Sequence, residues 1–90
     1  MSLDCQTFRM AWRRSWKVKD SNNPVDAFTA ADSSLCLARC LDINCMMFTY
    51  NGYFDDMCKL YTMAYDETKT EFVYFGPTLH IRVCASTGTI

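Results

Sequence analysis

Glycine, proline and long apolar runs are scarce in this 90-residue chain, which contains 3 Gly and 2 Pro. That composition excludes collagen-like and low-complexity proteins. The longest stretch without a charge, residues 43–54, is interrupted by Asn44, Asn51 and Gly52 and is too short to cross a bilayer. We therefore expect no direct membrane insertion. The net charge of −1 also excludes a protein that binds polyanions with its whole surface.

Processing signals are missing as well. Residues 1–3, Met-Ser-Leu, lead directly into Asp4 and Cys5, without the basic segment and apolar core of an export signal. No Asn-x-Ser/Thr glycosylation acceptor occurs. We interpret residues 4–85 as one module cut from a longer secreted protein, residues 1–3 as a vector remnant, and residues 86–90 as a tail.

Cysteine, in contrast, is abundant, and a small domain with a marginal core needs such staples. The six thiols, an even number that allows 15 pairings, predict three disulfides and an oxidising, extracellular compartment. A zinc site is disfavoured because the spacings are not those of paired knuckles. A redox enzyme is disfavoured because no Cys-x-x-Cys occurs. The cysteines are Cys5, Cys36, Cys40, Cys45, Cys58 and Cys84.

The residue patterns predict an α+β fold, with one helix packed on a mostly antiparallel β-sheet. Alternation predicts a strand over residues 5–10 that continues to Val18. Ser33, or alternatively Asp32, is expected to cap a helix that ends at Leu41. Further strands are expected over residues 45–50 and 57–63, joined by a loop at 51–56. Residues 72–75 and 79–84 are expected to form a final β pair.

This layout also predicts which thiols pair. Cys40 ends the helix and Cys45 starts the next strand, so the two meet across a short connection. Cys36, one turn earlier, faces Cys58 on the partner strand. Cys5 and Cys84 remain, and they would join the terminal strands.

The ordered spacing resembles the PAN/apple module family. The resemblance rests on Cys36-x3-Cys40-x4-Cys45, Phe48-x-Tyr50 and Cys58-x-Leu60, enclosed by Cys5 and Cys84. It implies a non-catalytic binding domain of a secreted or surface protein, with a helix stapled to a central hairpin. Residues 5–36 depart from the family pattern in their richness in Trp and Arg. The resemblance carries over no binding residues.

A basic segment, Arg9 to Lys19, contains five of the nine basic residues and no acid. One interpretation is that Trp12 and Trp16 anchor the core and the cations are solvated. In the other, the segment is extended, and a shared basic face binds an acidic protein or a heparin-type glycan. Export disfavours nucleic acid. The candidate cations are Arg13, Arg14, Lys17 and Lys19.

Aromatic residues around the central hairpin form a second candidate surface. Phe48 and Tyr50 are expected on the core face, and Tyr53 and Phe54 at the exposed loop. Asp55 and Asp56, beside them, are interpreted as solubilising residues rather than a catalytic pair. His80, the single histidine, has no free thiol to activate if all cysteines are paired.

Together these observations predict an extracellular recognition module that is not an enzyme and holds no metal or cofactor. The expected partners are an extracellular protein and other modules of the same parent chain, bound in protein–protein adhesion. The alternative is a lectin-like module that binds acidic glycans through the basic segment. Salt separates the two, because binding by cations falls steeply with ionic strength.

Overall fold

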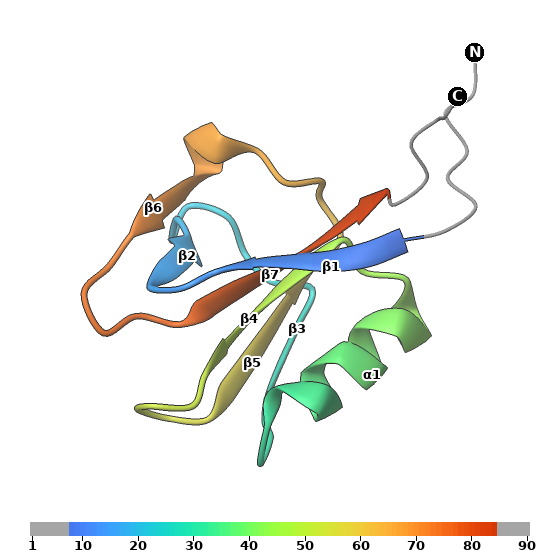
Figure 1. Cartoon of the computed structure of the whole chain (residues 1–90), viewed down its shortest axis with the longest axis horizontal. Helices are drawn as coiled ribbons and strands as arrows, with labels where there is room; N and C mark the ends of the chain where they lie inside the picture. Colours follow the sequence, from blue (N-terminus) through green and yellow to red (C-terminus); the bar gives the residue numbers. More distant parts are fainter. Residues whose placement is uncertain (1–7, 85–90) are drawn as a thin grey trace.

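The computed structural model describes residues 8–84 and shows a small α+β domain with one helix on an antiparallel sheet (Figure 1). The large sheet has the strand order β1-β7-β4-β5-β3, and a second sheet consists of β2 and β6. The strands are β1 (Phe8–Arg13), β2 (Trp16–Val18), β3 (Asp26–Thr29), β4 (Met47–Asn51), β5 (Met57–Tyr61), β6 (Thr70–Phe72) and β7 (Thr78–Cys84). The helices are α1 (Ser33–Ile43) and the short 3₁₀ helix η1 (Glu67–Lys69).

Helix α1 is capped by Asp32, the alternative to Ser33, and runs to Ile43, two residues beyond the expected end. The Asp32 carboxylate accepts a hydrogen bond from the backbone N–H of Ser34 at 2.9 Å, which satisfies one of the free donors at the helix start. Asn44 ends the helix in the left-handed conformation, with φ of 58°. Cys36 and Cys40, one turn apart, form the buried side of the helix.

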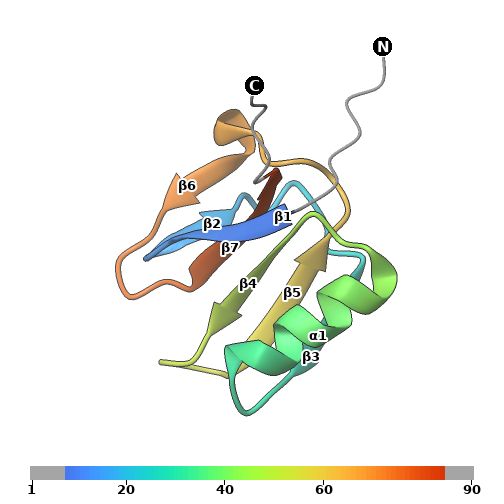
Figure 2. The same cartoon turned by 45° about the vertical axis from the view of Figure 1, so that its right-hand side comes forward.

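The large sheet has an apolar core on each face. Along β4, Phe48 and Tyr50 point to one face and Met47 and Thr49 to the other, as the alternation predicted. Helix α1 covers the first face (Figure 2), where Phe48 and Leu60 pack with the half-cystines. The second face carries the other core, formed by Val18, Met47, Tyr61, Leu79 and Ile81.

Two disulfides join α1 to the sheet region as predicted. Cys36 is bonded to Cys58 of β5 with a Cα–Cα distance of 5.7 Å. Cys40 is bonded to Cys45, just before β4, with a Cα–Cα distance of 4.8 Å. The third predicted pair involves Cys5, which lies outside the described residues, and therefore stays a prediction. Among the described residues, no helix has the length and apolar character needed to span a bilayer.

Three expectations about the strands are wrong. The strand predicted to run through to Val18 is broken by a turn at Arg14–Ser15, where Ser15 has a φ of 55°. Strand β3 was not expected at all. The last two segments do not pair: β6 pairs with β2, whereas β7 lies between β1 and β4. The last strand, β7, thus lies beside the first strand, β1, and joins it to β4 in the middle of the sheet.

Candidate functional site

Three connections meet at one end of the large sheet and enclose a cleft of about 790 Å³. They are the β1–β2 turn, the β4–β5 loop at residues 51–56 and the β6–β7 loop at residues 73–77. Figure 1 shows the three on the same side of the domain. We call this the aromatic cleft, because its lining residues include Trp12, Arg14, Tyr50, Tyr53, Tyr74, Phe75 and His80.

Four of these rings are presented to solvent. Trp12 is 57% exposed, and the exposure of Tyr53, Tyr74 and Phe75 ranges from 79% to 83%. An aromatic side chain has an area of about 200 Å², so the four rings expose about 600 Å². That area lies at the upper end of the roughly 300–600 Å² found for the largest apolar patch of a typical monomer. Patches of this size are often functional.

The β6–β7 loop holds Phe75 in an unusual backbone conformation. Its φ is 55°, in the left-handed region that bulky residues rarely adopt. The following residue, Gly76, packs so closely that a Cβ atom would lie 2.8 Å from the carbonyl oxygen of Val73. The Gly76 N–H donates to that same oxygen at 2.9 Å. This tight turn keeps the Phe75 ring at the surface rather than in a core.

Charge in the aromatic cleft is one-sided. The Arg14 guanidinium lies 5.6 Å from the centroid of the Trp12 ring, within cation–π range. None of the lining residues that the structure describes has a carboxylate. His80 adds no charge at neutral pH, because burial lowers its pKa and its ring stacks on Phe48 at 4.5 Å. The cleft therefore offers a single cation among aromatic rings.

Tyr50 fixes the floor of the cleft. Its hydroxyl donates to the backbone oxygen of Ala30 at 2.9 Å and contacts the Asp56 carboxylate at 3.2 Å. Burial, and secondarily the charge of Asp56, raise the pKa of Tyr50. Asp56 is exposed, and it also helps to hold the Tyr50 side chain in place, a role that the sequence did not indicate. Asp55 accepts a hydrogen bond from the Met57 backbone N–H at 3.1 Å.

The predicted aromatic residues at the hairpin are exposed as expected, with Tyr53 in the cleft and Phe54 on the same loop at 85% exposure. Arg14 comes from the basic segment and Tyr53 from the aromatic hairpin surface, and the structure places both in the aromatic cleft. In one interpretation of the basic segment, Trp12 and Trp16 both anchor the core. Instead, Trp12 lines the cleft and Trp16 packs against the second core.

The single basic face does not form, because the segment is not extended. Arg13 lies 3.7 Å from the centroid of the Trp16 ring and donates to the Tyr65 hydroxyl. Lys17 forms ion pairs with Asp20 at 2.8 Å and Glu71 at 3.8 Å. Lys19 is exposed just after β2. Only Arg14 of the predicted cations lines the aromatic cleft.

Tyr74 and Phe75 are the cleft residues that sequence reasoning missed. Both are strong β-formers, so they were interpreted as part of a strand. The adjacent Gly76-Pro77 pair was the available signal for a loop.

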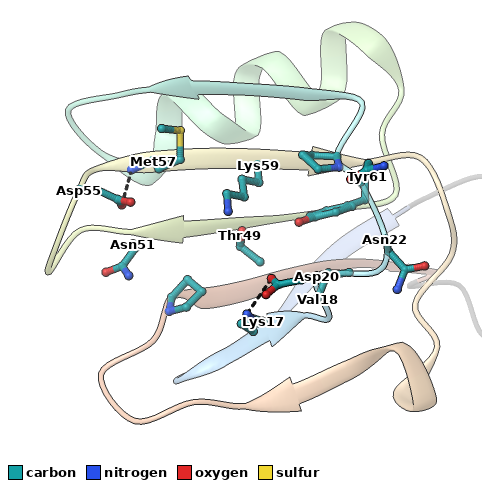
Figure 3. A pocket seen from close by; sticks show the side chains of 13 residues that line it. Lys17, Val18, Asp20, Asn22, Thr49, Asn51, Asp55, Met57, Lys59 and Tyr61 are labelled. Atoms are coloured by element: carbon teal, nitrogen blue, oxygen red, sulfur yellow. Dashed lines mark hydrogen bonds and ion pairs between the residues drawn. The ribbon is translucent and has the colours of Figure 1, made fainter.

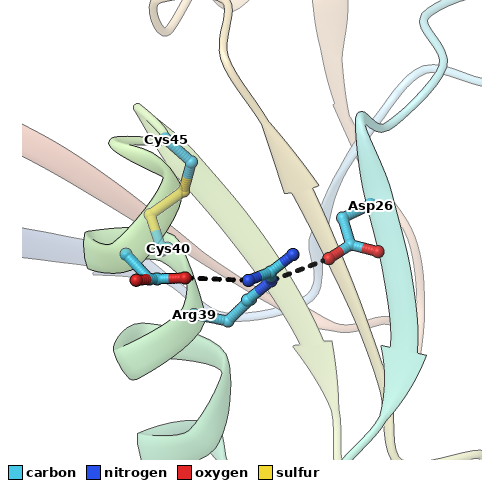
Figure 4. A network of polar contacts seen from close by, with 5 residues as sticks. Asp26, Arg39, Cys40 and Cys45 are labelled. Atoms are coloured by element: carbon cyan, nitrogen blue, oxygen red, sulfur yellow. Dashed lines mark hydrogen bonds and ion pairs between the residues drawn. A yellow bond between two sulfur atoms is a disulfide. The ribbon is translucent and has the colours of Figure 1, made fainter.

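An ionic network links α1 to β3 (Figure 4). Arg39 of α1 reaches Asp26 of β3 at 3.1 Å and Asp42 at 2.8 Å. The hydrogen bond to Asp26, opposed by burial, is the main reason that the pKa of Arg39 is raised. These ion pairs connect α1 to the edge strand β3, and they provide Arg39 with carboxylate partners in both Asp26 and Asp42.

Two further results bear on the chemistry of the chain. Within residues 8–84, no three His, Cys, Asp or Glu side chains gather closely enough to hold a metal ion. Comparisons with protein-family models, with curated proteins and with solved structures each found no match.

Proposed function

We propose that this chain is an extracellular, non-catalytic module of the PAN/apple type that binds a partner protein through the aromatic cleft. The observation that carries the proposal is the meeting of Trp12, Tyr53, Tyr74 and Phe75 from separate connections at one end of the sheet. The largest apolar patch of a monomer is often functional, and these rings come from connections that are distant in the sequence. The two disulfides support an oxidising compartment.

The composition of the cleft favours a protein partner. Trp, Tyr and Arg are the residues most enriched among binding hot spots, and the cleft contains all three. Rings with few rotatable bonds lose little conformational entropy on binding. The lone Arg14 cation would select an acidic or neutral partner surface, since no described carboxylate in the cleft offsets it.

A capture experiment with matched variants tests the proposal. The immobilised domain would be incubated with extracellular extract, beside Tyr53→Ser/Tyr74→Ser and the control Leu41→Ser. Leu41 is 55% exposed and lies on α1, outside the cleft. We expect the double variant to lose the proteins that the original domain and the control retain. Equal retention by all three would refute the proposal.

Phe75→Gly gives a second variant that separates binding from folding. Glycine adopts a positive φ without strain, and the exposed ring of Phe75 contributes little packing. We expect this variant to stay folded and to bind more weakly.

An acidic glycan remains the second candidate, favoured by the unopposed charge of Arg14 in the cleft. Retention on immobilised heparin at two salt concentrations distinguishes it. A glycan site would lose affinity steeply as salt rises, whereas aromatic protein contacts would respond weakly. Arg14→Gln would abolish glycan retention and only reduce protein binding.

A further inference from the structure

A second, smaller cleft of about 240 Å³ lies on the other face of the sheet, beneath the loop of residues 19–24 (Figure 3). We call it the polar cleft. Strands β4 and β5 supply its floor, and Lys17 and Asp20 stand at one wall. Its lining shares only Asn51 with that of the aromatic cleft. Figure 3 shows Lys59, Thr49 and Tyr61 pointing toward one another at its centre.

Two hydroxyl groups in the floor belong to almost fully buried residues. Thr49 is 3% exposed and Tyr61 is 4% exposed. Neither hydroxyl has a hydrogen-bond partner among the residues that the structure describes. Although both residues are buried, neither hydroxyl oxygen is itself fully buried, so both reach the cleft. These two are therefore available to whatever occupies the cleft.

Tyr61 is a neutral donor and acceptor at physiological pH. Burial, and secondarily the charge of Asp20, raise its pKa above the ordinary value of 10.0. Its ring is held in the second core, so the position of the hydroxyl is fixed.

The cations of the polar cleft differ in their pairing. Lys17 is held by Asp20 and Glu71, as described above. Lys59 forms no ion pair within the described part of the chain. Its charge nevertheless acts on the cleft, where it contributes, after Lys17, to the lowered pKa of Asp20. A ligand anion would find Lys59 as its partner.

Carboxylate acceptors and side-chain amides, which both donate and accept, surround this cation. The carboxylates of Asp20 and Asp55 and the amides of Asn22 and Asn51 line the cleft. A ligand that carried several negative charges would be repelled by the carboxylates. A ligand with one negative charge and several hydroxyl donors would satisfy both kinds of group. The volume is below the roughly 300–1,000 Å³ that drug-sized ligands occupy, so the ligand is small.

We propose that the polar cleft binds a single carboxylate-bearing sugar residue, with its carboxylate on Lys59 and its hydroxyls on Thr49, Tyr61 and the surrounding acceptors. A neutral sugar would leave Lys59 without a partner. An acidic peptide would bring backbone N–H donors in place of hydroxyls, and it is therefore the competing ligand in the test. The proposal does not depend on the aromatic cleft.

Binding is measured by NMR titration of the intact disulfide-bonded domain. The probes are methyl β-glucuronide and N-acetylneuraminic acid, beside methyl β-glucoside and a glutamate-containing dipeptide. We expect at least one of the two sugar acids to bind and to shift the resonances of the polar cleft. The glucoside and the dipeptide should bind at least about tenfold more weakly, since a hydrogen bond to a charged group gives a factor of this order.

Matched variants locate the site. Lys59→Met should weaken sugar-acid binding by about tenfold or more, and Tyr61→Phe, which removes only the hydroxyl, by about threefold to tenfold. Lys69→Met changes an exposed lysine outside the cleft and should have no effect. Tyr53→Ser/Tyr74→Ser should also leave this binding unchanged, which separates it from the proposed protein site.

Three results would overturn the proposal. They are the absence of any shift in the polar cleft with both sugar acids, equal binding of the neutral glucoside, and unchanged affinity in Lys59→Met. Tighter binding of the dipeptide would instead assign the cleft to acidic peptides and would also reject the sugar.

Discussion

The two described disulfides should differ in how strongly they stabilise the domain. Cys36–Cys58 spans 22 residues and Cys40–Cys45 spans 5. In the loop-entropy model these closures contribute about 3.4 and about 2 kcal/mol to the free energy of unfolding. All four cysteines are fully buried in the same core, so each double Cys→Ala variant loses a similar amount of packing. The difference between variants thus isolates loop length.

Urea unfolding of the two double variants measures this difference. Cys36→Ala/Cys58→Ala should be less stable than Cys40→Ala/Cys45→Ala by about 1.4 kcal/mol, or roughly 5–10 °C in Tm for a domain of this size. The m-value, which is the slope of the unfolding free energy against urea concentration, should be equal in the two variants. Equal m-values show that both expose the same surface on unfolding. Equal stabilities, or the reverse order, would show that native-state packing rather than chain entropy dominates.

Three further substitutions probe single features of the fold. Gly76→Ala should cost about 1–3 kcal/mol in chemical denaturation, because the new Cβ meets the Val73 carbonyl at 2.8 Å; an unchanged midpoint would contradict the tight turn. Burial lowers the pKa of His80, so the unfolded chain binds the proton more readily than the folded domain does. The free energy of unfolding should therefore fall as the pH drops below about 6.5. His80→Gln should flatten this pH dependence, and a pH profile parallel to that of the original domain would contradict the reasoning. Asp32→Ala should cost about 1 kcal/mol through loss of the helix cap to Ser34, with no loss expected for the control Ser21→Ala.

Local chemistry explains which elements could be predicted. The cap at Asp32, the turn at Asn51-Gly52 and the alternation through Phe48 and Tyr50 act over a few residues, and each appears in the structure. The helical spacing of Cys36 and Cys40 correctly indicated two disulfides for the same reason. These signals need no knowledge of distant parts of the chain.

Other elements depend on long-range pairing. Strand β3 has four residues and forms through its register with β5, for example Phe28 opposite Cys58. The break at Ser15 follows no turn signal, since serine rarely adopts a positive φ. The turn lets β2 pair with β6 instead of extending β1.

The candidate site was predictable only in part for the same reason. Tyr53 and Phe54 lie beside a recognisable turn, and their exposure followed from it. Tyr74 and Phe75 look like strand residues in the sequence. Their convergence with Trp12 comes from the placement of β7 between β1 and β4, which no local pattern indicates.

The antiparallel pairing of β1 with β7 determines where tethers would attach. Phe8 lies opposite Cys84 at one end of this strand pair, and Arg13 lies opposite Leu79 at the other, near the aromatic cleft. The start of β1 and the end of β7 therefore lie side by side at the end of the strand pair away from the aromatic cleft, so a tether attached through them would begin far from the cleft.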